Sequence, residues 1–274
     1  MKIHHTFLLP ALATSAVLSV TAAAAEKPLK ALLVIGGCCH DYGVQKDILE
    51  AGIEARGNIE VDVCYSPDTS TKATFACYEK DDWAAGYDVV IHDECSADIK
   101  DAKVVERILA PHRKGLPGVN LHCSMHSYRV SPEFKKPLAQ GAEGALWFEF
   151  LGLQSSSHGQ QKPIAISYIA ADHAVTKGLE NWTTGNEELY NNLRIHDSAT
   201  PLAKGKQGDA ETVVVWTNSY GEAKTRVFST TLGHNNQTLS DDRYLDLVTR
   251  GLLWSCGKLG DDGKPAAGYA PAVK

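Results

Sequence analysis

Short stretches rich in apolar residues alternate with helical stretches through the first half of the chain. Residues 31–35 form a continuous apolar run short enough for a buried strand, and the pattern predicts further strands at residues 59–65, 87–91 and 118–121. The stretches at 44–56 and 101–114 have the pattern of helices, and Gly57 and Gly115 follow them where helices commonly end. Strands separated by helices in this way predict βαβ units and a mostly parallel central sheet in an α/β fold.

The second half of the chain is less regular. It predicts strands at residues 162–170, 211–217 and 226–232, a polar loop at 197–209 and an amphipathic helix at 244–256. No internal repeat and no break in composition marks a second domain. We therefore expect one α/β domain over residues 26–259, followed by a tail at 260–274 that is ordered only where it docks.

Residues 1–25 have the pattern of a secretory signal peptide. A basic start at Lys2 precedes an apolar stretch at 7–20, and small residues at 22–25 provide the cleavage site. The apolar stretch is too short to span a bilayer as a stable helix, so we expect no stable membrane insertion. The predicted location is outside the cytoplasm, either periplasmic or secreted.

Charge and composition narrow the class of partner. The chain has 274 residues, of which 43% are hydrophobic, and this content is enough for a sizeable core. Its net charge of −6 is spread along the sequence without a basic stripe, so we expect no nucleic-acid partner. A small neutral substrate is compatible with this charge. Oligomeric state is left open.

The seven cysteines form no regular framework and no CxxC pair. Cys38 and Cys39 are adjacent, and a bond between neighbouring cysteines is not expected without strain. Cys64 and Cys95 end or follow predicted strands, and we expect them to be core thiols. The sequence therefore does not predict a disulfide scaffold.

Five histidines come at or just past the ends of predicted strands: His40, His92, His122, His126 and His234. The carboxyl ends of parallel strands form one rim of a sheet, where ligands bind. Residues far apart in the chain can therefore meet in one pocket. Because imidazole suits both proton transfer and metal binding, the pattern predicts a site and favours an enzyme.

Several motifs, taken in order, resemble the trehalose-utilisation (ThuA-like) family. They are Val34-Ile35-Gly36-Gly37 with His40-Asp41, Asn120-Leu121-His122-Cys123, Ser127-Tyr128-Arg129, the stretch 171–179, Asn186-Glu187-Glu188-Leu189-Tyr190, Leu232-Gly233-His234-Asn235 and Gly251-Leu252-Leu253-Trp254. Together they cover nearly the whole chain after residue 25. One departure is His173-Ala174, where the family usually has His-Pro.

This resemblance implies a three-layer, flavodoxin-like fold similar to that of class I glutamine amidotransferases. It also implies a role in carbohydrate catabolism, because members are associated with glycosides, disaccharides and their 3-keto derivatives. A fold does not fix a reaction, so both hydrolysis and elimination stay open. The alternative is a non-catalytic carbohydrate-binding or accessory protein of sugar utilisation.

The predicted catalytic residues are His122, His234, Glu188 and His40. The two strand-end positions of His122 and His234 carry the strongest argument, and the family pattern favours Glu188 as a general base with Tyr190 nearby. The predicted substrate-binding residues are Asp41, Asp93, His126, Tyr128, Arg129, Tyr190 and Asn235. His158 and His173 lie in predicted loops and are weaker candidates for the site. We expect His112 and His196 at the surface.

Two further chemistries follow from the residues near His122. His122 and His126 are four apart, a spacing that suits two ligands of one metal, so we expect His122, His126 and His234 as ligands if a divalent ion such as zinc or manganese is bound. No other cofactor is expected. Cys123 could act as an amidotransferase-like nucleophile, but the glycines of a nucleophile elbow are missing around it.

Overall fold

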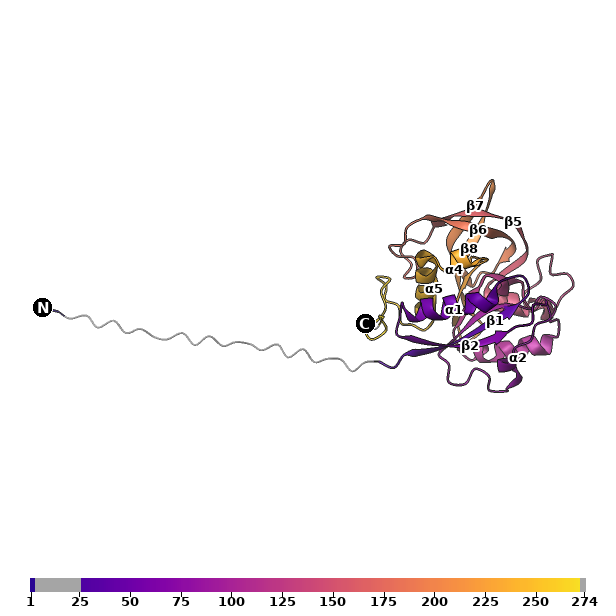
Figure 1. Cartoon of the computed structure of the whole chain (residues 1–274), viewed down its shortest axis with the longest axis horizontal. Helices are drawn as coiled ribbons and strands as arrows, with labels where there is room; N and C mark the ends of the chain where they lie inside the picture. Colours follow the sequence, from indigo (N-terminus) through magenta and orange to yellow (C-terminus); the bar gives the residue numbers. More distant parts are fainter. Residues whose placement is uncertain (3–25, 272–274) are drawn as a thin grey trace.

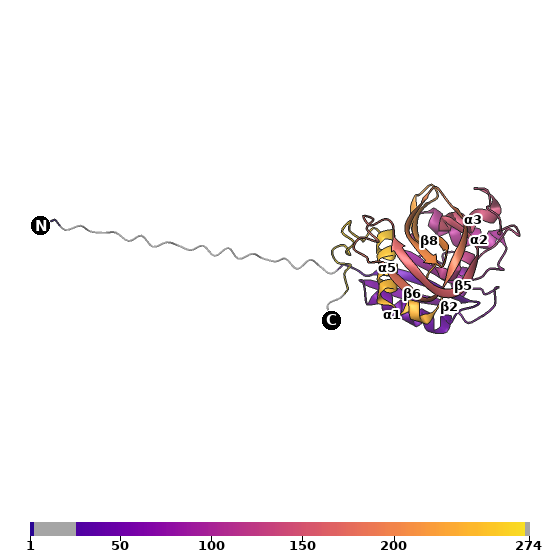
Figure 2. The ribbon, with the colours of Figure 1, turned by 90° about the horizontal axis from the view of Figure 1, so that it is seen from above.

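The computed structural model describes residues 1–2 and 26–271, so nearly all of the predicted signal peptide lies outside the described residues. One nine-stranded sheet runs through the described part, in the order β2-β1-β3-β4-β9-β8-β7-β5-β6. Antiparallel strands form the upper part of the molecule in Figure 1, which Figure 2 shows from above, and parallel strands form the lower part. No helix in the described ranges is long and apolar enough to cross a membrane.

The parallel half of the sheet confirms the strands predicted for the first half of the chain. It contains β1 (Leu29–Gly37), β2 (Ile59–Ser66), β3 (Val89–Cys95), β4 (Gly118–Leu121) and β9 (Thr225–Thr230). Neighbouring strands in this half pair in parallel. The third strand begins and ends later than the predicted 87–91, and this shift moves His92 from the end of the strand into its interior.

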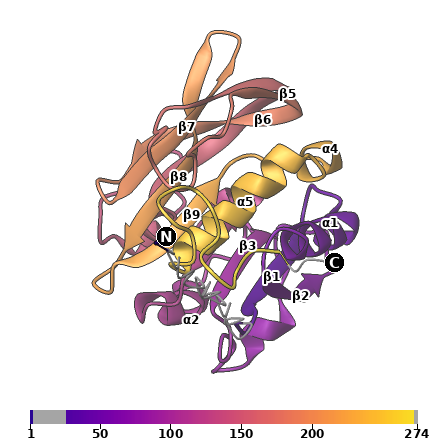
Figure 3. The ribbon, with the colours of Figure 1, turned by 90° about the vertical axis from the view of Figure 1, so that its left-hand side faces the viewer.

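Helices cover both faces of the parallel half. On one face α1 (Tyr42–Glu54) and α5 (Asp242–Ser255) pack against alternate residues of β1, and on the other face lie α2 (Ala102–Arg113) and α3 (Leu146–Leu151). Figure 3 shows α1 and α5 on the opposite side of these strands from α2. Burial on both faces explains why residues 31–35 form an uninterrupted apolar run instead of an alternating one.

The second half of the sheet is antiparallel. The strands β8 (Ala210–Tyr220), β7 (Ala199–Gln207), β5 (Leu153–Tyr168) and β6 (Trp182–Ile195) continue from β9, and each pairing is antiparallel. The predicted α/β class is confirmed. The prediction of a mostly parallel sheet is wrong because the sheet is mixed, and the flavodoxin-like description does not extend to the antiparallel half.

Several elements of the second half differ from the prediction. The polar loop predicted at 197–209 is the strand β7, which is hydrogen-bonded between β5 and β8. Its backbone partners, rather than its polar composition, decide its conformation. The strand β5 begins well before the predicted 162, and β6 has no counterpart in the prediction. The shorter elements are η1 (Ala76–Glu79), η2 (His122–His126), η3 (Glu143–Ala145) and α4 (Asn236–Leu239).

Two disulfides correct the expectation for the cysteines. Cys38 is bonded to its neighbour Cys39, and Cys64 is bonded to Cys77. Cys64 is therefore not a free core thiol, whereas Cys95 is free and buried as predicted. The second bond ties the end of β2 to η1 across a separation of 13 residues.

The described part of the tail docks onto the start of the sheet. The carbonyl groups of Gly268 and Tyr269 accept hydrogen bonds from Asn58, just before β2. The side chain of Asn58 also donates to the carbonyl of Glu26. These contacts, rather than the composition of the tail, account for its ordered position.

Candidate functional site

A cavity of about 620 Å³ lies between the carboxyl ends of the parallel strands and the inner parts of β5 and β6. Its lining residues are Cys38, Cys39, His40, Thr71, Cys95, Ala97, Cys123, His126, Arg129, Phe134, Lys135, Ser156, Ser157, His158, Gln161, Glu188, Tyr190 and His234. Both halves of the sheet therefore contribute side chains to one site. The predicted rim of the parallel sheet forms one wall.

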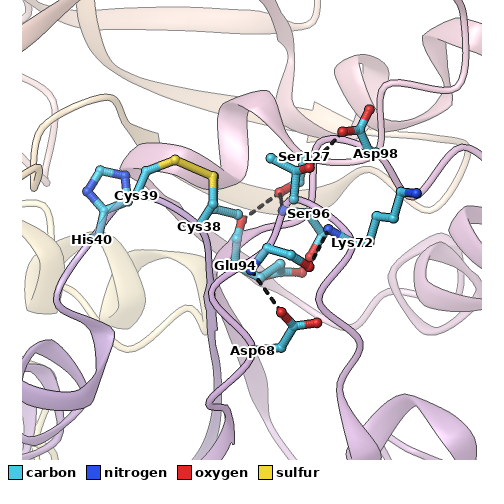
Figure 4. The surroundings of a disulfide bond; sticks show 12 residues. Cys38, Cys39, His40, Asp68, Lys72, Glu94, Ser96, Asp98 and Ser127 are labelled. Atoms are coloured by element: carbon cyan, nitrogen blue, oxygen red, sulfur yellow. Dashed lines mark hydrogen bonds between the residues drawn. A yellow bond between two sulfur atoms is a disulfide. The ribbon is translucent and has the colours of Figure 1, made fainter.

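Two glycines at the end of β1 bring His40 to this wall. Gly36 and Gly37 have φ of 141° and 100°, and a Cβ on them would lie 2.5 Å and 2.3 Å from the carbonyl oxygens of Ser66 and Cys95. The glycines are thus needed for close approach of the neighbouring strands. Beyond them, Figure 4 shows the Cys38–Cys39 disulfide beside His40.

His122 follows β4 in a left-handed backbone conformation, with φ of 36°. This is the position at which a strand-to-helix elbow presents a functional side chain, and the residue there is His122 rather than Cys123. The His122 Nδ1 lies 2.7 Å from the carbonyl oxygen of Thr231. A donor at Nδ1 leaves Nε2 with its lone pair, and this atom lies 3.4 Å from the hydroxyl of Tyr190 and 3.6 Å from Glu188 Oε2, two residues that line the cavity.

His234 is held in place by a buried carboxylate on β6. The Glu187 side chain accepts hydrogen bonds from the backbone N–H groups of Gly233 and His234. The carbonyl oxygen of His234 lies 3.2 Å from both the Nδ1 of His40 and the Nε2 of Gln45. The loop after β9 is therefore fixed to both halves of the sheet.

The imidazoles of His40, His122 and His234 form a cluster, which we call the rim cluster. The ring centroids are 4.8 Å apart for His40 and His122, 4.9 Å for His40 and His234, and 5.4 Å for His122 and His234. Burial, helped by the two neighbouring histidines, lowers the pKa of His40 to about 3. Burial also lowers the pKa of His234.

The Glu188 carboxylate faces this cluster from β6. Its Oε2 lies 3.6 Å from His122 Nε2, and its Oε1 lies 3.4 Å from His234 Nδ1 and 3.5 Å from His158 Nδ1. Burial favours a higher pKa for Glu188, but contact with His122 and the charges of His122 and His234 outweigh it and lower the pKa to about 2. Glu188 is therefore a carboxylate at neutral pH.

Tyr190 and His126 extend the wall beyond Glu188. Their rings stack with centroids 4.2 Å apart, and the Tyr190 hydroxyl lies 3.4 Å from His122 Nε2. The His126 Nε2 is 3.0 Å from Ser155 Oγ on β5. His126 is therefore part of the same site but does not face the ring nitrogens of the rim cluster.

Comparisons with known proteins decide the family. A family model described as "ThuA: Trehalose utilisation" matches residues 32–255, which is most of the chain. The chain belongs to the ThuA family. A comparison of the sequence with curated proteins gives no match.

Solved structures with the same fold include two putative ThuA-like proteins. The protein from Parabacteroides merdae has a TM-score of 0.62 and 20% identity, over 90% of this chain and 98% of its own. That from Bacteroides uniformis has a TM-score of 0.61 and 14% identity, over 89% of this chain and 98% of its own. A putative GMP synthase protein from Thermoplasma acidophilum has a TM-score of 0.52 and 10% identity, over 85% of this chain and 96% of its own. At these identities the likeness shows the fold alone.

The remaining predicted site residues of this ThuA-family chain lie at different distances from the rim cluster. Arg129 lines the cavity and donates to the carbonyl of Ser156, whereas Tyr128 is buried and donates to Glu94. Asp41 and Asn235 line a neighbouring cavity. Asp93 is buried on β3, where burial raises its pKa, and it does not line the main cavity.

The thiol of Cys123 does not suit nucleophilic chemistry. It is buried, and contact with Cys95 together with that burial raises its pKa well above the usual value. An activated cysteine needs the opposite shift, because the thiolate is the nucleophile. The ThuA-family fold therefore resembles that of the amidotransferases without an activated thiol at this position.

Three residues of the site were not predicted. His158 was placed in a loop, but it lies on β5 and faces Glu188. Gln161, also on β5, donates to Glu188, and Glu187 holds the loop of His234. The alternation of side chains along β5 and β6 could have indicated these residues if the two strands had been recognised.

Proposed function

We propose that this ThuA-family protein is an exported enzyme of carbohydrate catabolism that acts on a glycoside or disaccharide, or on its 3-keto derivative. One observation carries the proposal: a buried carboxylate, Glu188, faces His122 and His234 across 3.4–3.6 Å at the wall of a cavity. A carboxylate opposite a group of imidazoles combines a general base with ring nitrogens that can exchange protons or bind a Lewis acid.

The shape of the site supports a substrate with two rings. A second cavity of about 690 Å³ adjoins the first, and both are lined by Cys39, His40 and His234. The bond between two sugar units would lie at these shared residues, with one unit in each cavity. Each volume is in the range of small-molecule sites.

The lining of the main cavity supports a polar ligand. Arg129, Gln161 and Ser157 supply hydrogen-bond donors, and the stacked rings of Tyr190 and His126 supply a flat wall. Sugar hydroxyl groups pair with such donors, and the apolar C–H face of a sugar packs on rings.

The chemistry follows from the acidity of a carbon next to a keto group. Glu188 removes the proton at C2 of a 3-keto sugar, and the electrons move onto the keto oxygen, which faces the rim cluster. The C1–O bond then breaks, and the departing oxygen takes the proton from Glu188. Addition of water across the C1–C2 double bond restores the 3-keto sugar, so the net reaction is hydrolysis. This route does not need the two flanking carboxylates of ordinary glycosidases.

The disulfides support the proposed export. Cys38–Cys39 and Cys64–Cys77 are both bonded, and disulfides persist in oxidising compartments such as the periplasm or the extracellular space. The pattern of residues 1–25 favours the same location.

Turnover of a 3-keto-glycoside tests the proposal directly. The purified chain is incubated with 3-keto-trehalose, and release of glucose is followed for wild type, Glu188→Gln and the control Glu222→Gln, an exposed residue after β8. We expect Glu188→Gln to lower kcat/KM about a thousandfold and the control to match wild type. A wild-type protein that is stabilised by the sugar but never changes it would overturn the proposal and indicate a binding protein.

Isotope exchange tests the route. In D₂O, removal and return of the C2 proton places deuterium at C2 of the product. Hydrolysis without deuterium at C2 would remove Glu188 from the role of carbon base.

A further inference from the structure

We infer that His40, His122 and His234 together bind one divalent transition-metal ion, with zinc favoured by the all-nitrogen donor set. This inference rests on the proposed function and deepens it, because it names what stabilises the negative oxygen. It also changes the predicted ligand set, since His40 takes the place of His126.

The spacing of the rim cluster fits one tetrahedral ion. One nitrogen from each of the three rings lies within 4.8 Å of the other two, and the ring centroids are 4.8–5.4 Å apart. An ion about 2.1 Å from each nitrogen, at tetrahedral angles, places the ring centroids about 5 Å apart. The rings are therefore already arranged around a common point.

Backbone carbonyls orient two of the three rings. His122 Nδ1 lies 2.7 Å from the carbonyl oxygen of Thr231, and His40 Nδ1 lies 3.2 Å from that of His234. An N–H donor at Nδ1 fixes the tautomer and leaves Nε2 free as a ligand, which is the usual support of metal-binding histidines.

The third ring has a buried nitrogen without a partner. His234 Nδ1 is buried and makes no hydrogen bond within the described chain. Such an atom normally has a partner, and its loss costs free energy. Its 3.4 Å separation from Glu188 Oε1 is long for a hydrogen bond, so this nitrogen stays available to an ion.

Glu188 lies beside the rim cluster. Its carboxylate approaches His122 and His234 but is not one of the three mutually close donors. A catalytic ion keeps one position for water or substrate, and there it would polarise a keto oxygen while Glu188 acts on the neighbouring C–H bond.

A second donor group lies close by and must be distinguished. His40, Cys95 and Cys123 also have donor atoms within 4.8 Å of one another. Both thiols are buried, and a thiol must lose its proton before it binds a metal ion. The histidines of the rim cluster need no such deprotonation.

Metal content and binding test the inference without reference to activity. Wild type and single variants are purified without chelators or thiol reagents, and bound metals are measured by mass spectrometry. Zinc affinity is then measured by titration of the stripped proteins. His40→Ala, His234→Ala and His122→Asn remove one ligand each, and asparagine suits the left-handed backbone at residue 122. His126→Ala and Cys123→Ser are matched controls from the same wall.

We expect close to one equivalent of metal in wild type and in both controls, and at least about tenfold weaker zinc binding in each of the three variants. Cobalt bound to the wild type should show the visible bands of a tetrahedral site, and these should be lost in His234→Ala. Far-UV circular dichroism identifies any variant that fails to fold. If one of the three ligand variants fails, the inference is tested with the other two.

Two results would overturn the inference. One is a wild type that neither contains metal nor binds zinc in the titration. The other is loss of binding in Cys123→Ser or His126→Ala to the same extent as in the rim-cluster variants. Turnover of 3-keto-trehalose by metal-free protein would remove the ion from the reaction and leave the proposed function intact. Metal binding without turnover would do the reverse.

Discussion

Two groups of histidines lie in this molecule, one at the cavity and one in the core. The rim cluster faces the cavity, and its polar contacts with Glu188 are 3.4–3.6 Å long. His92 and His112, which we call the buried pair, are fully buried, and their Nε2 atoms lie 3.1 Å apart. Both groups are rich in imidazole, but the rim cluster has a buried ring nitrogen without a hydrogen-bond partner in the described chain, His234 Nδ1, and two of its rings line the main cavity.

The buried pair is closed by hydrogen bonds on all sides. His112 Nδ1 lies 2.7 Å from the carbonyl oxygen of Leu116, and His92 Nδ1 lies 3.0 Å from Glu94. Tyr78 donates to the same Glu94 oxygen. The buried pair therefore stabilises the core, whereas the rim cluster is arranged for a ligand. The two groups contain the same residue type. The hydrogen bonds that their ring nitrogens make distinguish the structural histidines from the candidate functional ones.

The largest expected effect comes from the rim cluster. His122→Asn should lower kcat/KM on a 3-keto-glycoside by at least about a thousandfold, because the site loses a group of the rim cluster, which faces the keto oxygen as negative charge develops on it. The midpoint of thermal unfolding should change little. Steady-state kinetics and calorimetry measure both quantities, and full activity would remove His122 from the reaction.

The buried pair should show the opposite result. His92→Ala leaves a cavity and removes a partner from both His112 and Glu94, so we expect a loss of about 3 kcal/mol in the free energy of unfolding. Activity per folded molecule should stay close to wild type. Urea denaturation measures the loss, and a change below about 1 kcal/mol would contradict a structural role for the pair.

Acid should also distinguish the two groups. Burial, and then the nearby His92, lowers the pKa of His112 from 6.5 to about 3. Because the unfolded chain binds the proton more tightly, stability is present above pH 6.5 and is lost as the pH falls toward 3. We expect His112 alone to contribute a loss of about 2 kcal/mol between pH 7 and pH 5.

The control for this prediction is His112→Gln, which carries no titrating ring. Its stability should be lower at pH 7 but should fall less steeply between pH 7 and pH 5. Equal slopes for the variant and wild type in urea denaturation at each pH would contradict the prediction.

The smallest effect is expected at the outer edge of the site. The His158 side chain is 41% exposed and lies 3.5 Å from Glu188. An exposed contact of this kind contributes at most about 1 kcal/mol, so His158→Ala should raise KM a few-fold and leave kcat nearly unchanged. A loss of kcat/KM as large as that expected for His122→Asn would show that His158 takes part in the reaction.

The parallel half was predictable because burial on both faces gives a strand a continuous apolar run. Residues 31–35 illustrate this. From these strand ends the sequence placed His40, His122 and His234 in one region. It also placed His112 and His196 at the surface, which is wrong, because both are buried. Side-chain partners far along the chain decide such burial, and a local pattern does not contain them.

The antiparallel half could not be predicted to the same extent. The strand β6 mixes polar and apolar residues because it carries Glu187, Glu188 and Tyr190 into the site. The buried carboxylates break the alternation by which a strand is recognised. The same residues that give the site its chemistry therefore prevented the prediction of β6, the strand that positions them. The Cys38–Cys39 bond was missed for a similar reason, because neighbouring cysteines rarely pair.

β9 lies between β4 and β8 and joins the parallel half of the described sheet to the antiparallel half. His40 and the carbonyl oxygen of His234 that it contacts are 194 residues apart in the chain. Contacts of such long range form slowly, since a large loop must close before they contribute. A fragment that ends before β9 retains His40, His122 and Glu188, but it lacks the strand that joins the half of the sheet with the two histidines to the half with Glu188. Assays of this site therefore report on an intact, fully folded chain and are insensitive to its fragments.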